Sequence, residues 1–180
     1  MEDNKILKCI SDCEVLEIKV FETLGIKALN GSRLICEAID VFNHWIDPDF
    51  IKLDLIDFNV LTPEMFTRVY ETTADGGLMT LFGSLPGDWN QKILTQDQII
   101  EFCDNYRNWL KSASNLTFFL TKKDKDKPID DKQPYDNLFV IVVQVFSDGL
   151  SATFSRLEHD RAWYCSGERR VVVPVINSES

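Results

Sequence analysis

Leu94-Thr95-Gln96-Asp97-Gln98-Ile99 is a helix N-terminal signature that stands just before a long run with an apolar stripe. Thr95 is predicted as the N-cap residue, because its hydroxyl can accept the backbone N–H of Gln98 while the Gln98 side chain reaches back to the N–H of Thr95. Leu94 can pack on Ile99 as a hydrophobic staple. The stripe that follows predicts a helix with a broad buried face. It consists of Ile99, Cys103, Tyr106 and Leu110.

The chain beyond this helix is patterned as β-structure. Four runs rich in aromatic and β-branched residues occupy 116–121, 138–146, 150–157 and 170–175. Ser147-Asp148-Gly149 predicts a tight hairpin between the second and third runs, because Asp-Gly tolerates positive φ angles. Pro174 lacks a donor N–H, which places the last run at a sheet edge or its proline at a solvent-facing position. Four strands in succession predict an antiparallel meander.

The N-terminal half contains further helical patterns. Apolar residues at steps of three and four predict an amphipathic helix over 33–46, which Asp47-Pro48 ends because the residue before proline leaves the α region. Residues 6–24 also carry a helical stripe, although 15–21 tolerates a strand and 15–30 stays undecided. Residues 51–55 alternate in polarity, which indicates a short strand or an extended loop.

The segment before the signature is mixed in character. Thr62-Pro63-Glu64 could begin a helix, whereas the β-branched and aromatic residues that follow favour extended structure, so 62–73 is open between the two and we favour a strand from Met65 to Thr72. A short helical turn is predicted after Gly77, with Gly83 at its C-terminal cap.

These elements predict an α+β fold in which an antiparallel β-meander of about four strands is covered by two or three amphipathic helices. Residues 1–180 are expected to form a single domain, in which 1–30 packs beside the helices or extends as an N-terminal helical arm. The run 122–137 has five Lys, five Asp and almost no apolar residues, so we expect a flexible hairpin loop there.

Composition limits the partners. The formal charge of −10 repels phosphate backbones and anionic lipid, so we expect no direct nucleic-acid ligand. No apolar run approaches the ~20 residues that a membrane-spanning helix needs, and the start lacks the basic region of a secretory signal. The five cysteines are scattered and odd in number, which fits reduced thiols packed as small hydrophobes. These features predict a cytoplasmic location without a membrane partner.

A catalytic hypothesis rests on Glu158, His159 and Asp160, which stand between two predicted strands. A carboxylate beside an imidazole is the raw material of acid–base chemistry. Adjacent residues of an extended chain point to opposite faces, however, so a polar turn explains the same residues.

A metal hypothesis rests on His44 with Asp47 and Asp49, supplemented by Asp54 and Asp57. One imidazole and several carboxylates suit a divalent ion and a metal-dependent hydrolase. His44 lies among apolar residues, where a packed histidine is commoner, and we predict no cofactor.

Common nucleophile and nucleotide-binding fingerprints are missing from the sequence. We therefore expect a non-catalytic protein-binding or regulatory module that contacts a basic protein partner. Trp89 in a polar loop and the acidic residues Asp54 and Asp57 are candidate contacts. The metal-dependent hydrolase and an inhibitor that mimics nucleic-acid charge are the alternatives, and the oligomeric state is not predicted.

Overall fold

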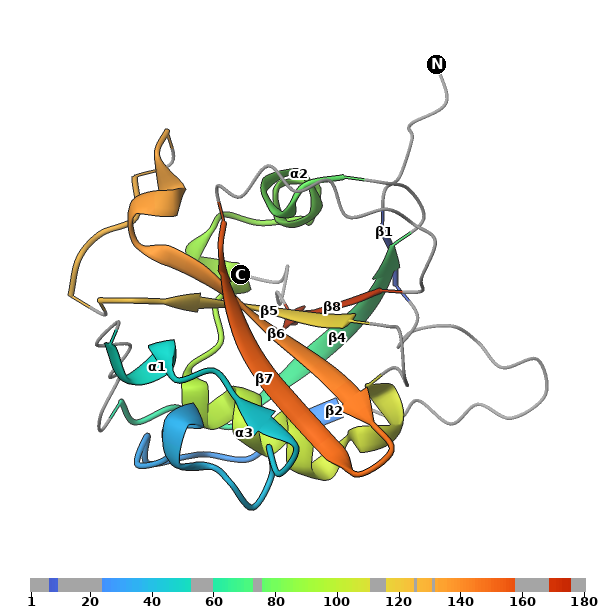
Figure 1. The fold of residues 1–180 in the computed structure, drawn as a ribbon. Coiled ribbons are helices and arrows are strands. Elements are labelled where there is room, and N and C mark those ends of the chain that lie inside the picture. Colours follow the sequence, from blue (N-terminus) through green and yellow to red (C-terminus); the bar gives the residue numbers. More distant parts are fainter. Residues whose placement is uncertain are drawn as a thin grey trace.

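The computed structural model describes residues 7–9, 24–52, 60–72, 76–110, 116–124, 126–130, 132–157 and 169–175. These residues form one mixed β-sheet with helices packed against both faces (Figure 1). The strands are β1 (Leu7–Cys9), β2 (Leu24–Ile26), β3 (Trp45–Ile46), β4 (Met65–Thr72), β5 (Leu116–Lys122), β6 (Leu138–Phe146), β7 (Gly149–Arg156) and β8 (Arg170–Pro174).

The sheet order is β1-β4-β8-β5-β6-β7-β3, and β2 also pairs with β4. Strands β5, β6 and β7 are antiparallel neighbours, joined through the predicted Ser147-Asp148-Gly149 hairpin between β6 and β7. Strand β8 pairs antiparallel with β4 and parallel with β5, and β3 runs parallel to β7. The sheet is therefore mixed and about twice as wide as expected.

The predicted four-strand antiparallel meander under two or three amphipathic helices is wrong. Its first three strands have the expected order, but the fourth, β8, lies between β4 and β5 instead of beside β7. The physical reason is visible in Val171, Val172 and Val173, which are all buried. Val172 faces one core while its two neighbours face the other. A strand buried on both faces belongs in the middle of a sheet.

Pro174 ends β8 without breaking a ladder. The N–H of Val175 donates to the Phe66 carbonyl at 2.8 Å, so the alternation of a strand turns the nitrogen of Pro174 towards β5. On that side the pairing has already ended at Val172 and Phe119. Of the two alternatives predicted for Pro174, the edge position of the strand is wrong, because β8 lies between β4 and β5. The proline is tolerated there because its missing donor lies beyond the last residue paired with β5.

Two hydrophobic cores lie on opposite faces of the sheet. One packs β-strand side chains such as Phe119 and Ile141 against α3 (Gln96–Asn105) and α1 (Asp49–Lys52). The other packs Phe118 and Val140 against α2 (Leu78–Gly83). None of the helices in the described ranges is long and apolar enough to cross a membrane.

Helix α3 begins as predicted. Gln98 N donates to Thr95 Oγ1 at 3.3 Å, and Thr95 N donates to Gln98 Oε1 at 2.9 Å, which completes the capping box. The α-helix ends at Asn105, and the apolar stripe continues in a 3₁₀ turn, Arg107–Trp109. Further 3₁₀ turns are Ile35–Glu37, Asn90–Lys92 and Pro134–Asp136.

The predicted helix over 33–46 is wrong: the segment holds only the 3₁₀ turn and β3. Its backbone bonds form short turns such as Ala38 N to Ile35 O. Other backbone groups bond outside the segment: Ile35 N donates to the Gln96 side chain at 3.1 Å and His44 N donates to Leu150 O at 3.0 Å. The apolar spacing predicted burial only in part. Leu34, Ile35, Ala38 and Phe42 are buried, whereas Ile39 and Trp45 are exposed.

Other expectations have mixed outcomes. The strand over Met65–Thr72 and the short helix near 78–83 are confirmed, but Gly83 is helical and lacks the positive φ of a left-handed cap. Residues 7–9 form a strand rather than a helix, and Ile51 lies in α1 rather than in a strand. Most of 1–23 and all of 53–59 lie outside the described residues.

The loop between β5 and β6 has a polar anchor. Asn137 is buried, and its side chain accepts from Asp124 N at 2.9 Å and donates to the carbonyls of Asp124 and Lys127 at 3.0 Å each. The flexibility expected for 122–137 stays a prediction.

Candidate functional site

Residues 33–52, which we call the edge segment, cross from α3 to the far edge of the sheet, where β3 lies beside β7 (Figure 1). Asn43 fastens this segment to the β6–β7 hairpin. Its Oδ1 accepts from Leu150 N at 3.2 Å, and its Nδ2 donates to Asp148 O at 3.5 Å. A Cβ at Gly149 would lie 2.0 Å from Asn43 Oδ1, so the contact requires glycine there.

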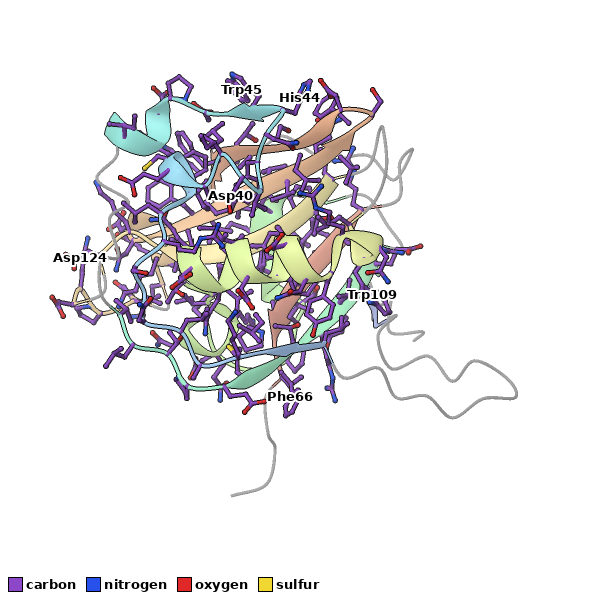
Figure 2. The ribbon with its side chains drawn as sticks, turned by 90° about the horizontal axis from the view of Figure 1, so that it is seen from below. Asp40, His44, Trp45, Phe66, Trp109 and Asp124 are labelled. Atoms are coloured by element: carbon purple, nitrogen blue, oxygen red, sulfur yellow. The ribbon has the colours of Figure 1, made fainter. Side chains whose placement is uncertain are left out.

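His44 is held by the same hairpin. Its Nδ1 lies 2.7 Å from Asp148 Oδ1, and its ring stacks on Phe146 with centroids 4.0 Å apart and an interplanar angle of 16°. The two contacts fix both the position and the plane of the imidazole. Figure 2 shows His44 and Trp45 side by side at the outer margin of the molecule.

Residues of the edge segment line an open surface hollow of about 600 Å³. We call it the edge hollow. Three large apolar side chains around it are exposed: Ile39 at 72%, Ile51 at 68% and Trp45 at 48%. Its remaining lining is Cys36, Phe42, Asn43, His44, Ile46, Asp47 and Pro48. Exposed apolar side chains gathered around one hollow are a feature of many binding sites.

The edge segment carries several carboxylates, and one of them, Asp47, lines the edge hollow. Glu37 and Asp40 are exposed, and Asp40 pairs with Arg33 across 2.5 Å. Asp47 lines the hollow, and its Oδ1 accepts from Asp49 N at 3.0 Å, which caps the first turn of α1. We call Glu37, Asp40 and Asp47 the acidic rim: Asp47 lines the hollow, and the other two each follow a lining residue in the chain, Cys36 and Ile39.

The histidine–aspartate pair supplies two of the three members of a nucleophilic triad, and Cys36 lines the same hollow as His44. Burial, and next the carboxylate of Glu37, raise the pKa of the Cys36 thiol. A thiol with a raised pKa is protonated at neutral pH and is a poor nucleophile. Within the described part of the chain, no hydrogen bond joins Cys36 to His44. The arrangement suits binding better than covalent catalysis.

The metal candidates do not converge. His44 bonds to Asp148 on the hairpin, while Asp47 caps α1 through Asp49. Within the part of the chain that the structure describes, no group of three or more His, Cys, Asp or Glu side chains could hold a metal ion.

The remaining acidic and catalytic candidates cannot be placed. Asp54 and Asp57 lie outside the described residues, as do Glu158, His159 and Asp160.

Trp89 is half-buried and packs against the core beside α2. The Nζ of Lys92 lies 5.0 Å from the centre of its ring and donates to Phe82 O at 2.9 Å. Burial lowers the pKa of Lys92, and the nearby Asp88 carboxylate partly opposes this shift. The visible contacts of Trp89 are thus internal, and its use by a partner stays a prediction.

Sequence reasoning missed Ile39, Trp45 and Ile51 as binding candidates, because the first two were assigned to the buried face of a helix. A usable signal was present. Asn43 stands within that pattern, and side chains of this type compete with helical backbone bonds. If 33–46 is irregular instead of helical, part of the apolar stripe is exposed.

Comparisons of the chain with protein-family models, with curated proteins and with solved structures found no match, so the functional argument depends on this geometry alone.

Proposed function

We propose that this protein is a non-catalytic protein-binding module and that the edge hollow is its docking surface. One observation carries the proposal: Ile39, Trp45 and Ile51 expose large apolar side chains around a single hollow. Leaving such side chains in water forfeits about 1.5–3 kcal/mol each relative to full burial. A partner that covered them would recover part of this free energy.

The rigidity of the surface supports the same function. The edge segment is tied to α3 through Ile35 and Gln96 and to the hairpin through Asn43 and Leu150. A surface that is already ordered loses little conformational entropy on binding. Trp45 is also the residue type most enriched among interface anchors, together with Tyr and Arg.

Two other exposed apolar residues provide an internal comparison. Leu61 is 79% exposed and Phe66 is 45% exposed, but neither lines the edge hollow. Figure 2 shows Phe66 on the opposite side of the molecule from Trp45. Leu61→Ser is therefore a matched control for substitutions at the hollow.

The test is selection of linear peptides from a displayed random library against the full chain, followed by measured affinities of the enriched peptides. We expect Trp45→Ala and Ile51→Ser each to weaken binding about tenfold, which is the effect of losing one interface anchor. Leu61→Ser should leave the affinity unchanged. Urea unfolding of each variant would check the fold.

The proposal fails if the library yields no binding peptide. It also fails if the affinities of the enriched peptides are the same for wild type and both hollow variants.

A further inference from the structure

We propose that the edge hollow binds a cationic apolar segment of another protein, in which large apolar side chains are flanked by Lys or Arg. This inference rests on the proposed function and specifies the partner that fits it. The hollow of about 600 Å³ has the size of sites that hold a ligand of several side-chain groups. The apolar side chains would fill the hollow, and the flanking cations would meet its acidic rim.

Charge supports a cationic occupant. The exposed Glu37 and Asp40 stand on either side of Ile39 in the chain, and Asp47 lines the hollow itself. Asp148, whose side chain is 68% exposed, adds another carboxylate at the hairpin. Two cations offset part of this charge: Arg33 pairs with Asp40, and Arg107 donates to Val41 O at 3.4 Å and shares a neighbouring hollow with Asp148. Complementary charge at an interface raises the association rate and excludes partners of the wrong sign.

The same charge disfavours a second copy of this chain as the occupant. A symmetric dimer through the edge hollow would place the acidic rim of one copy against that of the other. The net charge of −10 adds repulsion at longer range. A cationic segment meets neither penalty.

Backbone pairing would contribute little to this docking. Strand β3 ends the sheet but spans only Trp45–Ile46, and very short edge strands are poor templates for an added strand. Recognition therefore depends on the apolar side chains and on charge. This makes the identity of the flanking residues in the partner measurable.

The test uses two labelled peptides, Lys-Lys-Leu-Trp-Leu-Lys-Lys and the counterpart with glutamate at every lysine. We expect the lysine peptide to bind the full chain at low salt at least tenfold more tightly than the glutamate peptide. Trp45→Ala should weaken the lysine peptide, whereas Leu61→Ser should not.

A pair of double variants separates local from overall charge. Glu37→Gln with Asp40→Asn removes the two exposed carboxylates that flank Ile39 in the edge segment, whereas Glu64→Gln with Asp88→Asn removes two exposed carboxylates outside the edge segment. We expect the rim variant to weaken the lysine peptide about three- to tenfold and the control to change it less than twofold. The difference in affinity between the rim variant and the control variant should become smaller as salt is added.

The outcomes distinguish the two proposals. If both peptides bind equally and lose affinity with Trp45→Ala, the cationic partner is refuted and the docking surface stands. Equal effects of the two double variants would also refute the cationic partner. If neither peptide depends on Trp45 and library selection also finds no ligand of the hollow, both proposals are overturned.

Discussion

Gly149 allows the edge segment to lie against the β6–β7 hairpin. Its φ is 158°, and the space where a Cβ would stand is occupied by the side chain of Asn43. The Asp-Gly pair correctly predicted a hairpin from local turn chemistry. The structure adds a second use of the same glycine, because it admits a contact from a segment far away in the sequence.

Gly149→Ala should lower the free energy of unfolding by about 1–2 kcal/mol, because Asn43 must rotate away and give up its bond to Leu150 N. Urea unfolding measures the change. Gly83→Ala is the matched control, since nothing lies within 4 Å of its added Cβ and the residue is helical. We expect that control to be neutral or to stabilise by less than ~1 kcal/mol. Equal effects of the two substitutions would contradict the proposed contact.

Lys92 is a buried cation whose ammonium satisfies the Phe82 carbonyl near the end of α2. Burial lowers its pKa below the ordinary lysine value. At a pH between the lowered pKa of the folded chain and the ordinary lysine pKa, Lys92 is protonated in the unfolded chain but not in the folded chain. The contribution of Lys92 to stability therefore rises with pH across that window.

We expect the stability of the wild type, relative to Lys92→Met, to increase as the pH is raised through the lowered pKa towards the ordinary lysine value. Methionine keeps most of the apolar stem and removes the titrating group, so other groups cancel in the comparison. Urea midpoints at several alkaline pH values measure the effect. If the stability of the wild type relative to Lys92→Met stays constant or decreases as the pH rises, burial does not penalise the charged form of Lys92.

Strand β8 shows how an element can have a predictable type and an unpredictable position. The three consecutive valines predicted a strand, and the structure confirms it. The strand lies between β4 and β5 because its side chains pack into both hydrophobic cores. A strand at the edge of a one-sided meander would bury only alternate residues.

Val171→Ala and Val172→Ala should therefore each destabilise the fold by about 2 kcal/mol, because each leaves a cavity in a different core. Val175→Ala, at a half-buried residue just beyond β8, should cost less. Urea unfolding of the three single variants measures the pattern. A large effect at only one of the two buried valines would mean that one face of β8 is not packed.

Helix α3 and the edge segment differ in where their backbone bonds lie. The Thr95–Gln98 capping box is local, so residues 94–99 were enough to predict where α3 begins. The edge segment has comparable apolar spacing, but Ile35 and His44 donate their N–H groups to Gln96 and Leu150 instead of to their own turn. Periodicity identified only part of the buried set, and it does not report which partner takes the backbone bonds.

At the scale of the whole molecule, the net charge of −10 acts on folding and on docking with opposite signs. Self-repulsion within an acidic chain disfavours the compact state, whereas attraction to a cationic partner favours the complex. Added salt screens both interactions. Lys27 pairs with Glu101 at 2.9 Å, and such local attractions reduce the repulsion without removing the net charge.

We expect the stability of the free chain to rise between about 0.01 M and about 0.1 M NaCl, as the Debye length falls from ~30 Å to ~10 Å. Over the same range the affinity for the lysine peptide should fall. Urea midpoints and peptide titrations in matched buffers measure the two trends. If stability and peptide affinity change in the same direction with salt, the net charge does not act on folding and docking with opposite signs.

The candidate site was predictable only in part. His44 and Asp47 were singled out as metal ligands, and both line the edge hollow, but their contacts there are a hairpin carboxylate and a helix cap. Trp45 and Ile39 were assigned to a core because the predicted helix needed a buried face. Exposure depends on what packs over a residue, and one sequence without its fold does not contain that information.

The amino-acid sequence by itself determined the features that arise from neighbouring residues: the capping box of α3, the β6–β7 hairpin, and the strand character of β4 to β8. Tertiary structure alone decided the order of the strands, the loss of the 33–46 helix, and the edge hollow. Local features need bonds across a few residues, whereas the others depend on which distant segments compete successfully for the same backbone groups and the same core.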